Sequence, residues 1–280
     1  MTCMCRAASS LENNRHYHSD DRLAVKLLPA PARVLIHIPL FIKFFTQLLA
    51  PPGVYEYVIA RTKYIDAAFE RALAGRFDQI LLFGAGYDTR ALRFQGKAQH
   101  TCIFELDAPH TQQAKIKQLK KRNLSIPPNL VFIAIDFEKE PLSPKLDMAG
   151  FQKDRRNLFI LEGLLMYLKP ESVKETFQII REYAGTGSLV VFDYIRASVL
   201  RHENTLYGEA GLIKSVSKAG EQWQFGIEPA EIGAFAAVQG FEVSNHKCVH
   251  ELEVAYFQDA SGRQMGRING THCIVTMARP

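Results

Sequence analysis

Short apolar runs recur along the chain from residue 79 onward, and polar or glycine residues follow most of them. Five of these runs are continuously apolar instead of alternating, which is typical of strands buried on both faces of a parallel sheet. Two further apolar runs near the end of the chain are also predicted to be strands. The seven predicted strands are residues 79–83, 101–105, 130–135, 157–161, 188–193, 241–244 and 272–277.

Segments with helical signals lie between the predicted strands. Residues 109–123 and 229–239 each begin with proline, which suits the first turn of a helix. Residues 170–183 place apolar side chains four and three positions apart, and a glycine follows. This alternation predicts an α/β fold with a Rossmann-like, doubly wound, mostly parallel seven-stranded sheet and helices on both faces.

The first 78 residues precede the first predicted strand and are expected to form a helical N-terminal cap, or lid, over the ligand-binding edge of the sheet. We predict a single domain over residues 1–280, with residues 79–280 as its core. Within the cap, residues 34–50 are strongly apolar, but polar residues interrupt them and they fall short of the about 20 residues that span a bilayer. We expect a buried or lid helix there and no stable membrane insertion.

The chain of 280 residues has a formal net charge of +5, and its basic residues are scattered except for one denser group. This group has near-helical spacing and contains no aromatic residue that could stack on a base. We therefore expect a solvated helix face and no nucleic-acid partner. The group consists of Lys115, Lys117, Lys120, Lys121 and Arg122.

The five cysteines include no Cys-x-x-Cys pair, and Cys102 and Cys273 lie within apolar runs, as small core residues do. The nine histidines show no spacing with thiols or carboxylates that is typical of metal ligands. We therefore predict neither a disulfide framework nor a metal site. Such cysteine usage favours a reducing, cytoplasmic location.

A glycine-rich turn follows the first predicted strand and contains Gly84 and Gly86. Glycine allows the backbone to turn sharply and allows a ligand to approach without meeting a Cβ atom. Glu105 ends the next predicted strand, 21 positions after Gly84, and Asp107 lies beside it. Carboxylates at this place are suited to accept hydrogen bonds from the ribose hydroxyls of a nucleotide-like ligand.

Acidic residues also follow the third and fourth predicted strands. Asp136 and Phe137 follow the third, and this pair suits an adenine, with one polar contact to the exocyclic amine and one apolar face. Glu162 and Gly163 follow the fourth strand. Glycines or carboxylates therefore follow four successive strands, at the edge where open α/β sheets bind ligands.

This acidic edge distinguishes between two classes of cofactor. A dinucleotide has a pyrophosphate, which acidic residues repel, and Thr89 replaces the usual third glycine, with Asp88 before it. S-adenosylmethionine has a sulfonium and an ammonium group, which acidic residues attract. We predict S-adenosylmethionine as the cofactor, and an NAD(P)-dependent Rossmann oxidoreductase is the alternative.

These motifs resemble those of the leucine carboxyl methyltransferase family, which includes bacterial polyketide O-methyltransferases. The resemblance spans most of the chain, but residues 195–230 match less recognisably, so the substrate does not carry over. The matching segments are Arg6-Ala-Ala-Ser9 with Asp20-Asp21, Arg61-Thr-Lys-Tyr-Ile-Asp66, Gly84-Ala-Gly-Tyr-Asp-Thr-Arg90, Phe104-Glu-Leu-Asp107, Asp136-Phe137 and Glu162-Gly-Leu-Leu-Met-Tyr167.

The resemblance implies an S-adenosylmethionine-dependent methyltransferase and suggests a role for each cofactor-binding residue. Arg61 would pair with the methionine carboxylate of the cofactor, and Gly84 would lie under its amino-acid portion. Asp107, together with Glu105, would bind the ribose, and Asp136 and Phe137 would flank the adenine. Glu162 would contact the amino group or lie near the sulfonium.

The methyl acceptor is left open between a carboxylate and a hydroxyl. A carboxylate is ionised near neutral pH and needs no general base, whereas a phenol needs one, for which Glu162 or a nearby histidine is a candidate. Arg196 could offset the charge of a carboxylate substrate, and Tyr167 or Tyr194 could donate a hydrogen bond to the acceptor. No residue is assigned a catalytic role, and the oligomeric state is not predicted.

The apolar segment at residues 34–50 bears on the kind of acceptor. We expect its Phe41, Phe44 and Phe45 to form a wall of the acceptor pocket. Such a wall favours O-methylation of a small hydrophobic molecule. Carboxyl methylation of a protein C-terminus is the other alternative.

Overall fold

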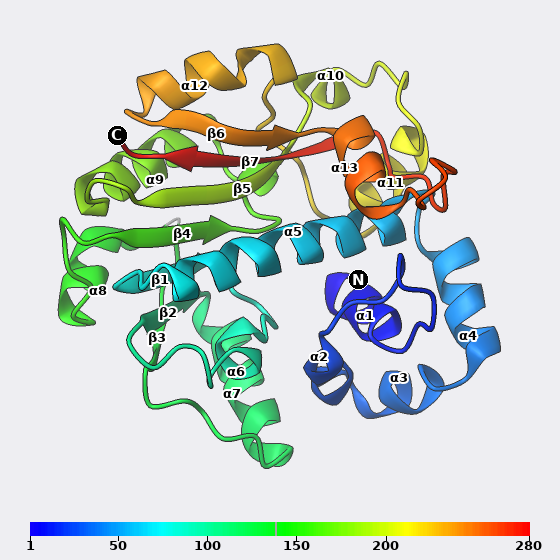
Figure 1. The fold of residues 1–280 in the computed structure, drawn as a ribbon, viewed down its shortest axis with the longest axis horizontal. Helices are drawn as coiled ribbons and strands as arrows, with labels where there is room; N and C mark the ends of the chain where they lie inside the picture. The colour runs from blue at the N-terminus through cyan, green and yellow to red at the C-terminus, as the bar shows by residue number, and fades with distance from the viewer. Residues whose placement is uncertain (138) are drawn as a thin grey trace.

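In the computed structural model, which describes residues 1–137 and 139–280, the seven predicted strands form one sheet (Figure 1). The strand order is β3-β2-β1-β4-β5-β7-β6. β1 to β5 are parallel, and β7 is antiparallel to both of its neighbours, β5 and β6. The prediction of a mostly parallel, seven-stranded Rossmann-like sheet is confirmed. The strands are β1 (Gln79–Phe83), β2 (Cys102–Asp107), β3 (Leu130–Ala134), β4 (Asn157–Leu161), β5 (Leu189–Ile195), β6 (Glu242–Lys247) and β7 (His272–Ala278).

Helices cover both faces of this sheet, and each face has its own layer of core. Ile80 and Leu82 of β1 belong to the layer under α5, α7 and α13, whereas Leu81 and Phe83 belong to the layer under α8, α9 and α12. Successive side chains of a strand point to opposite faces, so a strand covered on both sides is apolar at every position. The helices are α5 (Val54–Ala74), α7 (Pro109–Lys121), α8 (Leu142–Met148), α9 (Pro170–Tyr183), α12 (Ile232–Val238) and α13 (Val249–Tyr256).

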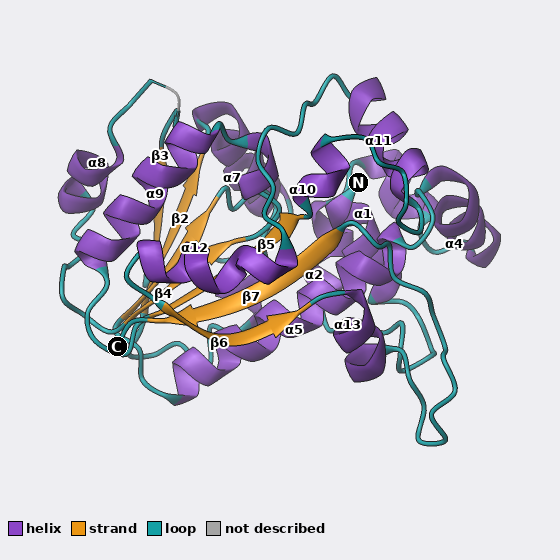
Figure 2. Ribbon diagram, turned by 90° about the horizontal axis from the view of Figure 1, so that it is seen from above, coloured by secondary structure: helices purple, strands orange, loops and turns teal. Residues whose placement is uncertain are grey.

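Shorter helices gather beyond the carboxyl ends of the parallel strands. Figure 2 shows α1, α4 and α11 at the end of the sheet opposite to the C-terminus of the chain, and Figure 1 shows that α5 begins beside them and runs across the sheet. The N-terminal residues therefore lie near the ligand-binding edge. These elements are α1 (Thr2–Ser9), α2 (Arg22–Leu27), α3 (Ala30–Leu35), α4 (Pro39–Phe44), η1 (Phe45–Leu49), α6 (Arg90–Arg93), η2 (Leu165–Tyr167), α10 (Ala197–Leu200), α11 (Glu209–Lys218) and η3 (Pro229–Glu231).

Residues 34–50 differ from the buried or lid helix that we expected. The segment divides into the end of α3, then α4 and η1, and α4 begins at Pro39, a residue that cannot continue a preceding helix without losing a hydrogen bond. Several large side chains are exposed, including Leu40 at 76% and Leu48 at 72%. In the described part of the chain, no helix has both the length and the apolar character needed to cross a membrane.

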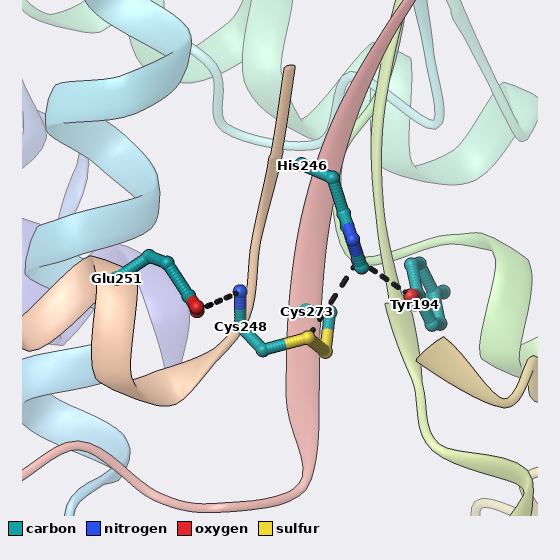
Figure 3. The surroundings of a disulfide bond; sticks show 5 residues. All are labelled: Tyr194, His246, Cys248, Glu251 and Cys273. Carbon is teal, nitrogen blue, oxygen red and sulfur yellow. Dashed lines mark hydrogen bonds between the residues drawn. A yellow bond between two sulfur atoms is a disulfide. The ribbon is translucent and has the colours of Figure 1, made fainter. Parts of the chain in front are cut away.

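Cys248 and Cys273 form a disulfide bond, contrary to the expectation that no cysteines are paired (Figure 3). Cys248 directly follows β6, and the β6–β7 register places it opposite Cys273, with 4.3 Å between the Cα atoms. The Nε2 atom of His246 lies 3.6 Å from Sγ of Cys248, so the structure also brings a histidine close to the two sulfurs of this disulfide. Cys102, expected in the core, is exposed. The cysteines therefore give no argument for a reducing compartment.

Reduction of this disulfide should lower the free energy of unfolding by about 3 kcal/mol, because the bond closes a loop between residues 25 positions apart. Urea unfolding followed by circular dichroism, with and without a phosphine reductant, measures this change. The double variant Cys248→Ser/Cys273→Ser should have the lower stability under both conditions. An unfolding midpoint of the wild type that reduction leaves unchanged would contradict the prediction.

Candidate cofactor and acceptor site

A cavity of about 610 Å³ lies at the carboxyl ends of β1 and β4. This volume is within the range of roughly 300–1,000 Å³ that is usual for small-molecule sites. One part of the cavity is lined by the loop that follows β1, together with Arg61 of α5 and Glu162 after β4. The other part is mostly apolar and aromatic, and its lining includes Tyr57, Met166, Tyr167, Leu212, Val216, Trp223 and His272.

The loop after β1 has a backbone that only glycine adopts readily. Gly84 and Gly86 have φ angles of +58° and +50°, in the left-handed region. A Cβ atom at Gly84 would lie 3.3 Å from the side chain of Leu164. The Gly86 N–H donates a short hydrogen bond to Oδ2 of Asp107, and the Ala108 N–H donates to Oδ1 at 2.7 Å. The glycine loop and Asp107 are therefore held together at the sheet edge.

The predicted adenine-binding residues lie next along the same edge. The N–H of Ile135 donates to the backbone carbonyl of Asp107 at 2.9 Å, so Asp136 and Phe137 follow directly beside it. The ring of Phe137 stacks near that of Phe83, with 6.4 Å between the ring centroids, and Oδ2 of Asp136 accepts a hydrogen bond from Lys139 at 2.9 Å. Neither residue lines the cavity, and Asp107, which both adjoin, lies just outside the lining, bound to Gly86 at its edge.

Glu105 is buried below the edge and does not line the cavity. Its Oε2 atom lies 2.5 Å from Nζ of Lys115, which is also buried. Burial raises the pKa of Glu105 to about 7, although the attraction of Lys115 opposes this shift. Two expectations are thus corrected: Lys115 is not on a solvated helix face, and Glu105 is paired inside the protein instead of facing the cavity.

Arg61 and Glu162 form a largely buried ion pair at the cavity wall. Nε of Arg61 lies 3.0 Å from Oε1 of Glu162, and Nη1 lies 2.7 Å from Oδ2 of Asp193. The other oxygen of Glu162 accepts a hydrogen bond from Arg90 at 2.7 Å. Burial alone would raise the pKa of Glu162, but the charges of Arg90 and Arg61 outweigh burial and lower that pKa to about 2. Glu162 is therefore an anion at neutral pH.

Arg90, the last residue of the Gly-Ala-Gly-Tyr-Asp-Thr-Arg motif, is fully buried and binds several carboxylates. Besides Glu162, it contacts Asp66 of α5 at 2.7 Å and Asp88 of its own loop at 2.5 Å. The Thr89 hydroxyl donates a hydrogen bond of 2.6 Å to the carboxylate of Asp21, and Asp21 also caps the N-terminus of α2. Asp88 and Thr89, expected to disfavour a pyrophosphate, thus bind other parts of the protein.

Arg6 attaches the first helix to the same loop. Its Nη2 donates to the backbone carbonyl of Tyr87 at 2.6 Å, and its Nη1 lies 3.2 Å from Asp21. A cluster of arginines and carboxylates thus joins α1, α2, α5, α6, the glycine loop and the ends of β4 and β5. We call it the ion-pair cluster; its members are Arg6, Arg61, Arg90, Arg93, Asp21, Asp66, Asp88, Glu162 and Asp193.

The charge of this cluster suits S-adenosylmethionine. Four arginines and five carboxylates have one net negative charge, whereas the sulfonium, ammonium and carboxylate groups of the cofactor have one net positive charge. The cluster also offers the cavity both a guanidinium, from Arg61, and a carboxylate, from Glu162, and the zwitterionic methionine portion can pair with both. Position 163 is a glycine with φ of +63°, and a Cβ there would lie 3.1 Å from Nη1 of Arg61.

Three residues that the sequence patterns did not single out form part of this site. Asp193, inside β5, accepts hydrogen bonds from the Tyr57 hydroxyl at 2.9 Å and from the Gly163 N–H at 2.6 Å. The ring of Tyr57 stacks on that of His272, with 4.3 Å between the centroids. The sequence did contain a signal for Asp193, because a carboxylate inside an otherwise apolar predicted strand needs a buried partner. His272 begins an antiparallel strand, so only the direction of β7 shows that it reaches this edge.

The three predicted substrate residues are not together. Tyr167 lines the cavity, whereas Tyr194 and Arg196 do not. The side chain of Tyr194 is fully buried on the other face of the sheet, where its hydroxyl lies 2.8 Å from Nε2 of His246. The segment 34–50, expected as a pocket wall, also lies outside the lining, and Leu212 and Val216 of α11 are there instead.

The sequence model of the leucine carboxyl methyltransferase family matches residues 1–181. This match covers well over half of the chain and contains the glycine loop and the whole ion-pair cluster except Asp193. The chain belongs to the leucine carboxyl methyltransferase family. The predicted resemblance is thereby confirmed.

Relatives of this family member have names of the same kind. A Bacillus subtilis protein named "Putative S-adenosyl-L-methionine-dependent methyltransferase YktD" is 28% identical over 202 residues, 72% of this chain and 66% of its own length. A Mycobacterium tuberculosis protein named "Putative S-adenosyl-L-methionine-dependent methyltransferase" is 35% identical over 134 residues, 48% of this chain and 41% of its own. The chain thus spans between two fifths and two thirds of these relatives.

The fold of this leucine carboxyl methyltransferase family member also has solved counterparts. The crystal structure of a "putative methyltransferase" from Thermobifida fusca superimposes with a TM-score of 0.62 over 99% of this chain and 94% of that chain. The sequence identity is 16%, so this likeness concerns the fold alone. Its near-complete coverage extends to the N-terminal helices as well as the sheet.

Replacement of Arg90 by leucine should lower the free energy of unfolding by about 3–5 kcal/mol, because it leaves buried carboxylates without their cation. Replacement of Lys97 by alanine is the control, because its ion pair with Glu70 is exposed and should contribute less than about 1 kcal/mol. Urea unfolding of both variants measures the two changes. Equal losses would contradict the structural role of the ion-pair cluster.

Proposed function

We propose that this chain is an S-adenosylmethionine-dependent O-methyltransferase that acts on a small hydrophobic acceptor. The observation that supports this most strongly is that the glycine loop and the Arg61–Glu162 ion pair face one cavity at the carboxyl ends of β1 and β4. The family and the names of the relatives support the same reaction class, and they favour it over a nicotinamide-dependent oxidoreductase.

Within this proposal the residues of the edge bind the cofactor, which supplies an electrophilic methyl group when bound. Arg61 and Glu162 orient the two charged groups of the amino-acid portion. Asp107, fixed by Gly86, accepts hydrogen bonds from the ribose, and Asp136 with Phe137 borders the adenine. Because the ion-pair cluster is already formed within the protein, these groups need little rearrangement on binding.

The remaining part of the cavity supports a hydrophobic acceptor. Its lining includes Met166, Leu212, Val216 and Trp223. These side chains exclude water, which would otherwise compete with the acceptor for the methyl group. A protein C-terminus is polar and would meet this lining less favourably. Methylation of a C-terminal peptide, without methylation of aromatic acids or phenols, would overturn this part of the proposal.

Calorimetric titration with S-adenosylmethionine and with its demethylated product tests the cofactor assignment. Asp107→Ala should weaken binding by about tenfold or more, because the proposed hydrogen-bond partner of the ribose is lost. Asp78→Ala is the matched control: it removes an exposed aspartate just before β1, at the opposite edge of the sheet, and should leave the affinity unchanged. If the folded wild type binds NADH and not S-adenosylmethionine, the proposal is wrong.

A further inference from the structure

A chain of buried hydrogen bonds ends at the imidazole of His272. The amide Nδ2 of Asn269 donates to the backbone carbonyl of Pro52 at 2.8 Å. Its Oδ1 atom accepts from the Thr271 N–H at 3.2 Å and lies 2.7 Å from the Thr271 hydroxyl. The Asn269 amide therefore has one satisfactory orientation, because the opposite one would put its oxygen against a carbonyl oxygen.

This chain determines which ring nitrogen of His272 has the hydrogen. The Thr271 hydroxyl has a single hydrogen, and it donates that hydrogen to Oδ1 of Asn269. At its 2.7 Å contact with Nδ1 of His272 the hydroxyl oxygen must therefore accept, so Nδ1 is the protonated nitrogen. In a neutral imidazole the other nitrogen, Nε2, then has a free lone pair.

Burial keeps this imidazole neutral. It lowers the pKa of His272 to about 4; nearby Asp193 opposes this shift, and Arg61 adds to it. The groups that face the ring are Tyr57 and Arg61 from α5 and Asp193 from β5. His272 is thus an uncharged hydrogen-bond acceptor at neutral pH.

The surroundings of the ring direct it to the cavity. The Tyr57 ring stacks on one side of the imidazole, with 4.3 Å between the ring centroids. The Trp223 ring stands perpendicular to the imidazole, with 5.7 Å between their centroids. His272 lines the cavity, and within residues 1–137 and 139–280 no hydrogen bond is made to Nε2. Nε2 is therefore the atom left to bind a ligand.

Glu162, the other candidate for a base, is not available for that role. It is bound by Arg61 and Arg90, and those charges lower its pKa to about 2, so it has little tendency to accept a proton. A hydroxyl acceptor therefore needs a different base. Among the described residues that line the cavity, His272 is the one histidine.

We propose that Nε2 of His272 accepts the hydroxyl proton of an uncharged aromatic or enolic acceptor, so that the product is an ether and not an ester. This inference rests on the proposed methyl transfer. The acceptor oxygen forms its bond to the methyl carbon while the carbon–sulfur bond breaks and leaves its electron pair on sulfur. The hydroxyl proton passes to Nε2 and later to solvent.

A weakly basic imidazole is sufficient for this step. A phenol has a pKa near 10, but its proton becomes strongly acidic once the oxygen is bonded to a methyl group. A base whose pKa lies between the pKa of the phenol and that of the methylated, still protonated oxygen can therefore accept the proton as the new bond forms. A carboxylate acceptor would instead meet the lone pair of Nε2 and the negative charge of Glu221, which also lines the cavity, and Arg61 on the cavity wall is already paired with Glu162 and Asp193.

Nitrogen-15 NMR of the histidine rings tests the tautomer without any reaction. At pH 7 the His272 signals, assigned by their loss in His272→Asn, should show a protonated Nδ1 and an unprotonated Nε2. Thr271→Val, which removes the accepting hydroxyl, should shift the signals toward the other tautomer. A protonated Nε2, or a charged ring at pH 7, overturns the proposal.

The acceptor class is tested with 2-naphthol and 2-naphthoate, in the presence of the demethylated cofactor for binding and of S-adenosylmethionine for turnover. We expect 2-naphthol to bind at least about tenfold more tightly, to shift the Nε2 signal and to be methylated. Tighter binding or preferred methylation of 2-naphthoate, or no binding of either probe, overturns the proposal.

His272→Asn separates the base from the scaffold, because asparagine keeps a donor near Nδ1 and lacks Nε2. It should lower kcat by about 100-fold or more and leave cofactor affinity unchanged. His202→Asn is the control, an exposed residue with a φ of +55°, which asparagine tolerates. Unchanged kcat in His272→Asn overturns the inference. Failure of the folded wild type to bind S-adenosylmethionine would instead reject the proposed function.

Discussion

The buried ion-pair cluster is the constraint on which the rest of this structure depends. Charges removed from water are tolerated only when each has a partner, and the partners here come from segments far apart in the chain. Arg61 and Asp66 come from α5, Asp21 from the start of α2, and Arg90 from the loop after β1. The N-terminal helices and the sheet must therefore assemble together, because neither part satisfies its buried charges alone.

The same constraint divides the cavity into two chemical environments. Near the glycine loop the wall has fixed charges of both signs, which suit a zwitterionic cofactor. Beyond Tyr57 the wall is aromatic and apolar, and His272 there is held neutral by burial and in one tautomer by the hydrogen-bond chain through Thr271. Because arginines pair with Glu162 and Asp193 and keep them ionised, these carboxylates are suited to bind and orient a ligand, and in the proposal above the imidazole takes the proton.

The direction of β7 and the aromatic contacts of Tyr57 together place His272 at this edge of the sheet. β7 runs against its neighbours, so its first residue lies where the parallel strands end. Tyr57 connects this position to the ion-pair cluster, since its hydroxyl binds Asp193 and its ring stacks on His272. Tyr57 therefore links the charged part of the site to the imidazole by contact, and the charges of Asp193 and Arg61 also act on the ring directly.

The sequence by itself determined the seven strands and the chemistry of the edge, because apolar periodicity and glycine loops are local properties of a chain. Its local motifs were enough to single out Gly84, Gly86 and Glu162, whereas Arg61 was singled out through the resemblance to the family. Only the tertiary structure decided which charges pair, because Glu105 with Lys115, and Arg90 with its carboxylates, are contacts set by packing. The register of β6 and β7 likewise decided the pairing of Cys248 with Cys273, and the direction of β7 decided where His272 lies. Such contacts join residues far apart in sequence, and no local pattern encodes them.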